Sequence, residues 1–294
     1  MVNSKYKDRL FSFIFGNSEK KEWTLSLYNT VNHSSYTNPE DITIMTMEDV
    51  LYMGMKNDLS FLITNIINMY EQQSSYNPNM PIRKLMYAAR IYDRYIHQNK
   101  LNIYGTKLIH LPVPKLVTFY NGKENKEDEI LELKNTFQTE NGQCINVEPD
   151  IEVRVKMINI NYGKNIELMT ACKPLFEYAW LIDRIRNNGK TMDIETAVDK
   201  ALNDMSEDFE IKIFLIANKA EVKQMCLTEY NETETMEMFR EEGREEGRKE
   251  GREEGADALG KLIVLLTENG ETELILKAST DPEVRKALYK KYNI

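Results

Sequence analysis

Residues 58–73 read DLSFLITNIINMYEQQ, which is two short runs rich in apolar residues on either side of the polar pair Thr64-Asn65. This pattern predicts two extended segments, 58–63 and 65–73, joined by a tight turn. In the second segment, strict alternation puts four residues on one side of the strand: Ile67, Met69, Glu71 and Gln73. The predicted face is therefore apolar at Ile67 and Met69 and ends in a carboxylate and a carboxamide, and polar groups in such a place indicate a specific role.

The sequence on either side of this hairpin predicts an alternation of helices and strands. Helical patterns cover residues 4–15 and continue through Trp23 and Val31, and further extended segments are expected at 42–46 and 50–55. Downstream, Pro81 suits the first turn of a helix that runs to about residue 98. Strands are expected at 116–120 and 151–160, and residues 164–238 are mostly helical. The predicted fold class is α/β, a mixed central sheet flanked by helices, with a helical C-terminal extension.

The C-terminal part of the chain has a composition of its own. Gly243, Gly247, Gly251 and Gly255 recur every four residues, with Glu and Arg or Lys between them. We interpret residues 239–255 as a solvated connector; the alternative is a smooth stripe where two helices approach closely. Residues 256–294 are expected to form a small helical tail, and residues 1–238 the main domain.

Composition and motifs exclude several classes of function. No apolar run reaches the length of a membrane span and no secretory signal is evident, so we expect a cytoplasmic protein with no membrane partner. The chain has three scattered cysteines and three histidines, so metal chemistry must rest on carboxylates. It lacks the glycine-rich phosphate-binding motifs, and no nucleotide cofactor is expected.

The first candidate site consists of oxygen ligands on the two central segments. If these segments pair, Asp58 and Glu71 converge on one hard cation, and the backbone carbonyl of Gln72 is a natural third ligand. The alternative is two solvated acids at strand ends, and the spacing alone favours that alternative.

Six stretches in a fixed order change this balance. They are KYKDRLFSFIFG (5–16), KNDLSFLI (56–63), YEQQSSYNPNMP (70–81), LVTFYNG (116–122), KPLFEYAWLIDRIR (173–186) and EEGREEG (241–247). Together they resemble the transposase-like family of PD-(D/E)XK nucleases, relatives of the recombination-promoting nucleases, in which an Asp and a Glu-x-Lys hold the metal. The resemblance implies a Mg²⁺-dependent or Mn²⁺-dependent endonuclease that acts on DNA, with Asp58 and Glu71 as ligands exposed at strand ends.

Two residues qualify this catalytic site. Gln73 stands where the family has lysine, so it orients the attacking water by hydrogen bonds and contributes no positive charge. By its position in the expected first helix, Asp8 is the candidate third acid. An ordinary first-turn acid that interacts with the helix dipole is an equally good interpretation of Asp8.

The helix after the site is basic within a chain whose net charge is −9. Four residues fall at helical spacing on one face, namely Arg83, Tyr87, Arg90 and Arg94, and we expect this face to contact the phosphate backbone of DNA. A second face, with Ile82, Leu85, Ala89 and Ile96, is expected to pack. A solvated charged face is the alternative, and Lys107, Lys115 and Lys123 extend the basic patch under the DNA hypothesis.

The predicted function is hydrolysis of DNA phosphodiester bonds by a metal-dependent endonuclease. One alternative is a weakened nuclease fold that binds DNA or a protein without cutting, and another is an oligomeric scaffold driven by the tail. Because a duplex break needs two cuts, we also expect a homodimer that depends on the C-terminal region. The apolar face at Leu259, Leu262, Ile263 and Leu266 is expected to contribute to it, since a short tail can hardly bury such a face alone.

Overall fold

The computed structural model describes residues 10–45, 59–138, 147–227, 244, 248, 255 and 257–292. The chain divides into two units, Met1–Tyr230 and Asn231–Ile294, each with its own internal packing. The expected boundary at residue 238 falls inside the second unit.

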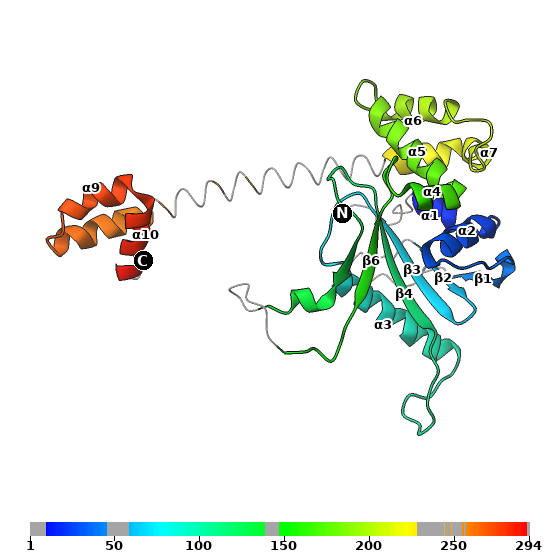
Figure 1. The fold of residues 1–294 in the computed structure, drawn as a ribbon, viewed down its shortest axis with the longest axis horizontal. Coiled ribbons are helices and arrows are strands. Elements are labelled where there is room, and N and C mark those ends of the chain that lie inside the picture. The colour runs from blue at the N-terminus through cyan, green and yellow to red at the C-terminus, as the bar shows by residue number, and fades with distance from the viewer. Residues whose placement is uncertain are drawn as a thin grey trace. The chain divides into compact units, whose positions relative to one another are not determined.

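A six-stranded mixed sheet in the order β1-β2-β3-β4-β6-β5 forms the centre of the described part of the first unit (Figure 1). Strands β1 (Ile42–Ile44), β2 (Leu59–Ile63) and β3 (Ile66–Gln73) pair antiparallel, and β4 (Val113–Tyr120) runs parallel to β3. Strand β6 (Arg154–Asn159) is parallel to β4, and β5 (Glu129–Glu132) closes the edge antiparallel to β6. The predicted α/β class with a mixed sheet is confirmed.

The central hairpin has the expected turn. Thr64 and Asn65 alone connect β2 to β3, and Thr64 adopts a φ of 51°. A left-handed residue suits a two-residue hairpin, because the turn then follows the twist of the strands. The segment predicted at 50–55 lies outside the described residues. In the described part of the sheet, β1 pairs directly with β2.

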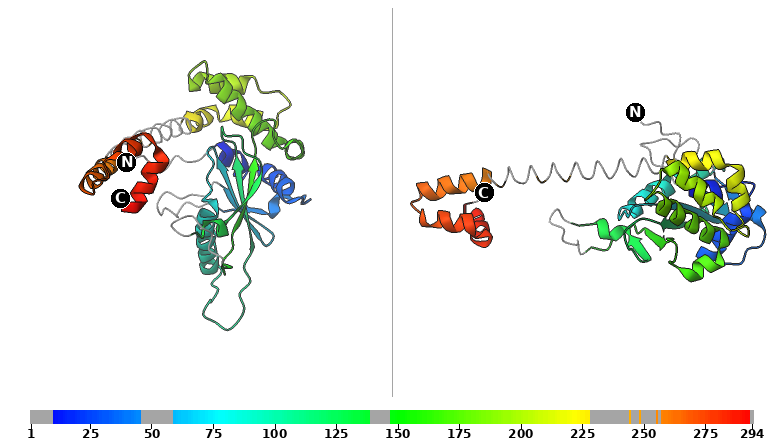
Figure 2. Two further views of the ribbon diagram at one scale, coloured as in Figure 1. Left: turned by 60° about the vertical axis from the view of Figure 1, so that its left-hand side comes forward. Right: turned by 90° about the horizontal axis from the view of Figure 1, so that it is seen from above.

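Helices cover both faces of this sheet (Figure 2, left). The helix α3 (Met80–Gln98) lies on one face, and α1 (Leu10–Phe15), α2 (Lys21–Asn32) and α5 (Lys173–Asn188) lie on the other. Further α-helices in the described part of the unit are α4 (Ile166–Ala171), α6 (Ile194–Asn203), α7 (Lys212–Ala217) and residues 219–227. The predicted helix at 4–15 is therefore confirmed over 10–15, and its earlier part lies outside the described residues.

Aromatic rings fasten the helical layer to the sheet on the face opposite α3. The ring of Phe11 on α1 lies 5.1 Å from that of Phe119 on β4, and Phe119 lies 5.3 Å from Tyr70 on β3. Phe61 on β2 continues the row at 5.2 Å from Tyr70. These contacts fix β3 from behind, so that side chains on its other face have a defined place beneath α3.

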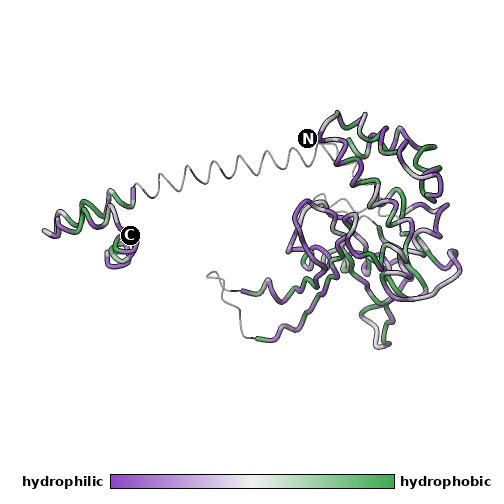
Figure 3. Tube along the Cα trace, turned by 45° about the horizontal axis from the view of Figure 1, so that its top comes forward, coloured by the Kyte–Doolittle hydropathy of each residue, from purple (hydrophilic) through white to green (hydrophobic). Residues whose placement is uncertain are grey.

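From residue 257 on, the described part of the second unit is a small helical bundle of residues 257–268, α9 (Glu273–Thr280) and α10 (Pro282–Tyr292). Hydrophilic and hydrophobic residues alternate along its helices (Figure 3), and the apolar ones form a core of Leu262, Leu266, Ala278 and Leu288. The unit thus buries Leu262 and Leu266 by itself. The expectation that a short tail hardly buries this face was wrong for Leu262 and Leu266, which pack in the core with residues of α9 and α10, whereas Leu259 and Ile263 are partly exposed.

None of the described helices is both long enough and apolar enough to span a membrane.

Candidate active site

Glu71 points into the layer between β3 and α3. The alternation predicted for β3 is present, since Ile67 and Met69 on the same face pack against Tyr87 and Ile91 of α3. The Glu71 residue is 1% exposed. The expectation of an exposed ligand at a strand end was therefore wrong for Glu71, because α3 covers the end of β3.

Two cations from consecutive positions on α3 meet this buried carboxylate. The Arg83 Nη2 atom lies 2.6 Å from Glu71 Oε1, and Lys84 Nζ lies 3.3 Å from Glu71 Oε2. Lys84 is itself completely buried and donates a hydrogen bond to the Met69 carbonyl at 3.0 Å. Burial of a charge costs several kcal/mol unless it is paired, so the three groups stabilise one another.

Lys84 was not among the residues predicted for the site. A signal for it exists in the sequence, because Met80, Lys84, Tyr87 and Ile91 fall at positions i, i+4, i+7 and i+11 of one helix. All four are buried in the structure. A lysine within an otherwise apolar helical stripe indicates a buried partner on the facing element, which here is Glu71.

Gln73 lies beside Glu71, as the alternation predicts. Its Nε2 atom is 3.4 Å from Glu71 Oε1 and 2.9 Å from the Met80 Sδ atom. The neighbouring Gln72 points to the opposite face, where its Nε2 atom donates to Asn121 Oδ1 at 2.5 Å. The side chain of Gln72 is thus separate from the site, and only its backbone can contribute a ligand there.

Two buried oxygen atoms beneath α3 receive no hydrogen bond from a described residue: Thr118 Oγ1, and Glu71 Oε2, whose partner Lys84 Nζ lies at ion-pair distance. The parallel register of β3 and β4 aligns Glu71 with Thr118, so the two side chains share a face of the sheet. Carboxylate and hydroxyl oxygens are the kind of ligand that Mg²⁺ prefers. A cation bound at Glu71 would have to replace the ion pairs of Glu71 with Arg83 and Lys84.

The other predicted acids, Asp58 and Asp8, lie outside the described residues. Asp58 directly precedes Leu59, the first residue of β2, and Leu59 pairs with Tyr70 next to Glu71. Within the described ranges, no three His, Cys, Asp or Glu side chains converge as a metal site would require.

The predicted faces of α3 were wrong in phase. Tyr87 is completely buried, with its hydroxyl 3.2 Å from Arg83 Nη2, whereas Ile82 is 40% exposed. The buried stripe lies on a different face from the one predicted, because the helix packs through the ring of Tyr87 and the stem of Lys84. Of the residues predicted to contact DNA, Arg90 and Arg94 are partly exposed, and Arg83 is committed to Glu71.

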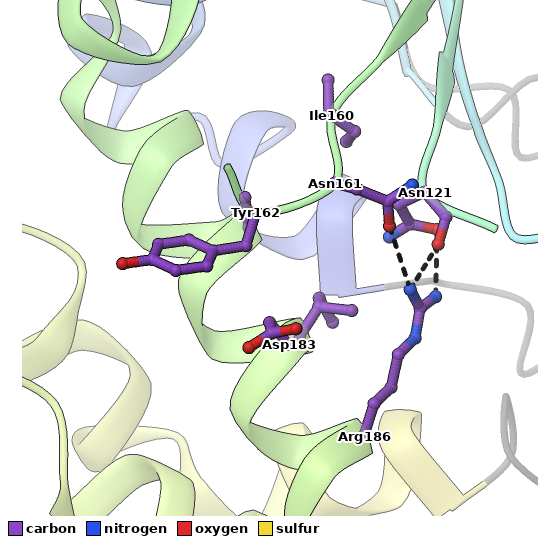
Figure 4. Close-up of a pocket in the computed structure, with 8 residues that line it drawn as sticks. Asn121, Ile160, Asn161, Tyr162, Asp183 and Arg186 are labelled. Carbon is purple, nitrogen blue, oxygen red and sulfur yellow. Dashed lines mark hydrogen bonds between the residues drawn. The ribbon is translucent and has the colours of Figure 1, made fainter. Parts of the chain in front are cut away.

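A second polar cluster lies where β4 and β6 end, next to α5 (Figure 4). The Arg186 guanidinium donates to the Asn121 backbone carbonyl and lies 3.3 Å from Asn121 Oδ1 and 3.4 Å from Asn161 Oδ1. The hollow beside it has room for about one water molecule. Because Asn121 also accepts from Gln72, this cluster fixes the end of β3 on the face away from Glu71.

Comparisons with protein-family models, curated proteins and solved structures give no match for this chain.

Proposed function

We propose that this protein is a metal-dependent DNA endonuclease of the PD-(D/E)XK type. The observation that carries the proposal is the buried Glu71 carboxylate, which lies at the end of β3 with Lys84 of the following helix beside it. The order of elements supports it too: a helix, antiparallel strands, an Asp before β2, a Glu-x-Gln at the end of β3, and then a helix.

Glu71 and Asp58 would hold the cation, together with the backbone carbonyl of Gln72. In the sequence Asp58 directly precedes Leu59, and the partner of Leu59 in the ladder is Tyr70, the residue before Glu71. When bound, Mg²⁺ supplies Lewis-acid chemistry that activates water and offsets phosphate charge. Mn²⁺ has the same preference for oxygen ligands.

Lys84 supplies the positive charge that Gln73 lacks. Its ammonium group donates a hydrogen bond to the Met69 carbonyl and lies beside Glu71. A positive charge held in this position would stabilise the negative charge that develops on a phosphate bound there. Gln73, next to the same carboxylate, is suited to orient a water molecule through its amide. The lysine of the family pattern is thus replaced in this proposal by a lysine from α3.

A second candidate function is a nuclease fold that binds DNA without cutting it. The observation in its favour is that both oxygens of Glu71 already face cations at ion-pair distance. If these ion pairs persist when DNA binds, Glu71 cannot ligate a metal. Metal binding by the protein therefore separates the two functions.

The test is nicking of supercoiled plasmid DNA by the full chain in Mg²⁺ and, separately, in Mn²⁺. We expect cutting that chelator abolishes, and a loss of about a hundredfold or more in Asp58→Asn and in Glu71→Gln. Asp150→Asn, an exposed acid in the same unit, is the matched control and should cut as the parent does. Thermal unfolding of each variant shows whether it is folded. Equal cutting by folded Glu71→Gln and parent would refute the assignment.

A further inference from the structure

Residues 99–112 connect α3 to β4 as a long excursion beyond the end of the helix (Figures 1 and 2). Three of the largest apolar side chains of this loop are open to solvent: Ile103 is 55%, Tyr104 93% and Leu108 77% exposed. A soluble surface rarely carries so many large apolar groups together unless they meet a ligand.

The base and the tip of the loop are held by hydrogen bonds. The Leu101 amide donates to the Ile96 carbonyl at 2.9 Å, and the Tyr92 hydroxyl donates to the Pro112 carbonyl at 2.7 Å. At the tip, the Asn102 side chain accepts from the Tyr104 amide at 3.0 Å. The apolar side chains are thus presented by an ordered backbone, which lowers the entropy cost of binding.

The charged residues of the loop are all basic. Residues 99–115 contain Lys100, Lys107, Lys115 and His110, all exposed, and no Asp or Glu, in a chain whose net charge is −9. Arg90 and Arg94 of α3 precede the loop, with the acid Asp93 between them, 3.5 Å from His97. Lysines interleaved with an exposed aromatic ring favour a nucleic acid, since phosphates pair with the cations and bases stack on the ring.

We propose that residues 99–112 are a DNA-binding wedge. Lys100 and Lys107 contact phosphates on either side, and Tyr104 and Leu108 press against bases that the wedge partly unstacks. The inference rests on the proposed function for its choice of ligand, and it assigns DNA contact to a surface separate from Glu71.

The dimensions suit one duplex that reaches both places. Helix α3 begins at the level of Gln73 and, with 19 residues, spans about 28 Å before the loop starts. One turn of duplex DNA measures about 34 Å. A duplex that runs along α3 with one phosphate near Glu71 would therefore reach the loop within a single helical turn.

The test is fluorescence anisotropy of a labelled 20-base-pair duplex in chelator, so that binding is measured without cutting. We expect Tyr104→Ser with Leu108→Ser to weaken binding about tenfold and to leave its salt dependence unchanged. We expect Lys100→Gln with Lys107→Gln to lower the salt slope by about 2. Ile213→Ser, at a position 80% exposed on α7, is the matched apolar control and should bind as the parent does.

The outcomes separate this proposal from the nuclease proposal. Unchanged affinity in the Tyr104 and Leu108 variant overturns the wedge, as does a change in particle mass with unchanged affinity, which would assign the loop to contact between copies of the chain. A parent that binds DNA through the loop but never cuts it refutes only the nuclease. A parent that binds no DNA overturns both.

Discussion

Lys84 and Glu71 form a buried pair whose members come from different elements, and their interaction is measurable without any assay of activity. Lys84 Nζ and Glu71 Oε2 are 3.3 Å apart, and both residues are almost completely excluded from solvent. Removing one partner leaves the other charge buried; if Glu71 is the one left, it keeps its ion pair with Arg83 and its hydrogen bond from Gln73.

We therefore predict that Lys84→Met lowers the free energy of unfolding by about 3 kcal/mol. In a double-mutant cycle with Glu71→Gln, the combined loss should be smaller than the sum by about 1–3 kcal/mol. Urea unfolding measures both. Strictly additive losses would show that the two side chains do not interact.

If the nuclease proposal holds, Gln73→Lys should also restore part of the cutting lost in Lys84→Met, since position 73 lies beside Glu71.

A second prediction at this scale concerns Cys172, a thiol buried in the main core. Desolvation raises the pKa of Cys172 to about 11, and burial also raises the pKa of Tyr70. Between pH 9 and 11 the folded chain keeps a proton that the unfolded chain releases, so stability falls as pH rises through this window. Urea unfolding at pH 8 and pH 10.5 should show the loss, and Cys172→Ala should lose less over the same interval. An identical loss in Cys172→Ala would contradict the assignment.

At the scale of elements, the hairpin could be predicted because its determinants are local. The period of two in β3 and the Thr64-Asn65 turn act over a few residues, and they placed Glu71 and Gln73 on one face as the structure has them. Helix α3 was also predicted, with Pro81 in its first turn.

The orientation of α3 could not be predicted in the same way. Its apolar and basic residues are compatible with more than one phase, and the choice depends on what the sheet presents. Lys84 forms an ion pair with Glu71, so this side of α3 faces the sheet, and Tyr87, about one turn later, is buried on the same side. The short strand β5 was missed because Glu129–Glu132 has no clear alternation and is ordered by pairing with β6. The contact of Arg186 with Asn121 spans 65 residues, beyond any local pattern.

At the scale of the whole molecule, the two units differ in what they offer for association. The C-terminal unit buries Leu262 and Leu266 within itself, so a partner must use other surfaces of the region after residue 238. Among its described residues, Leu276 is 73% and Val264 55% exposed. Of the Glu/Arg/Gly repeat, only Arg244, Arg248 and Gly255 are described, and all three are helical and exposed.

The homodimer stays a prediction, and the Glu/Arg/Gly repeat is its proposed contact surface. One site of the proposed kind cuts one strand per encounter, so two chains held together are suited to break a duplex. Glycines four apart on a helix permit close approach of a second helix, and Glu and Arg between them can pair across it. Light scattering should give twice the chain mass of 34.4 kDa for the full chain, and a single-chain mass for one ending at Met238. Leu276→Ser with Val264→Ser should leave the full chain dimeric if the two chains contact each other through the repeat.

A monomeric full chain at micromolar concentration, or a shortened chain that stays dimeric, would contradict the prediction. A monomer would restrict each encounter of the proposed nuclease to a nick in one strand.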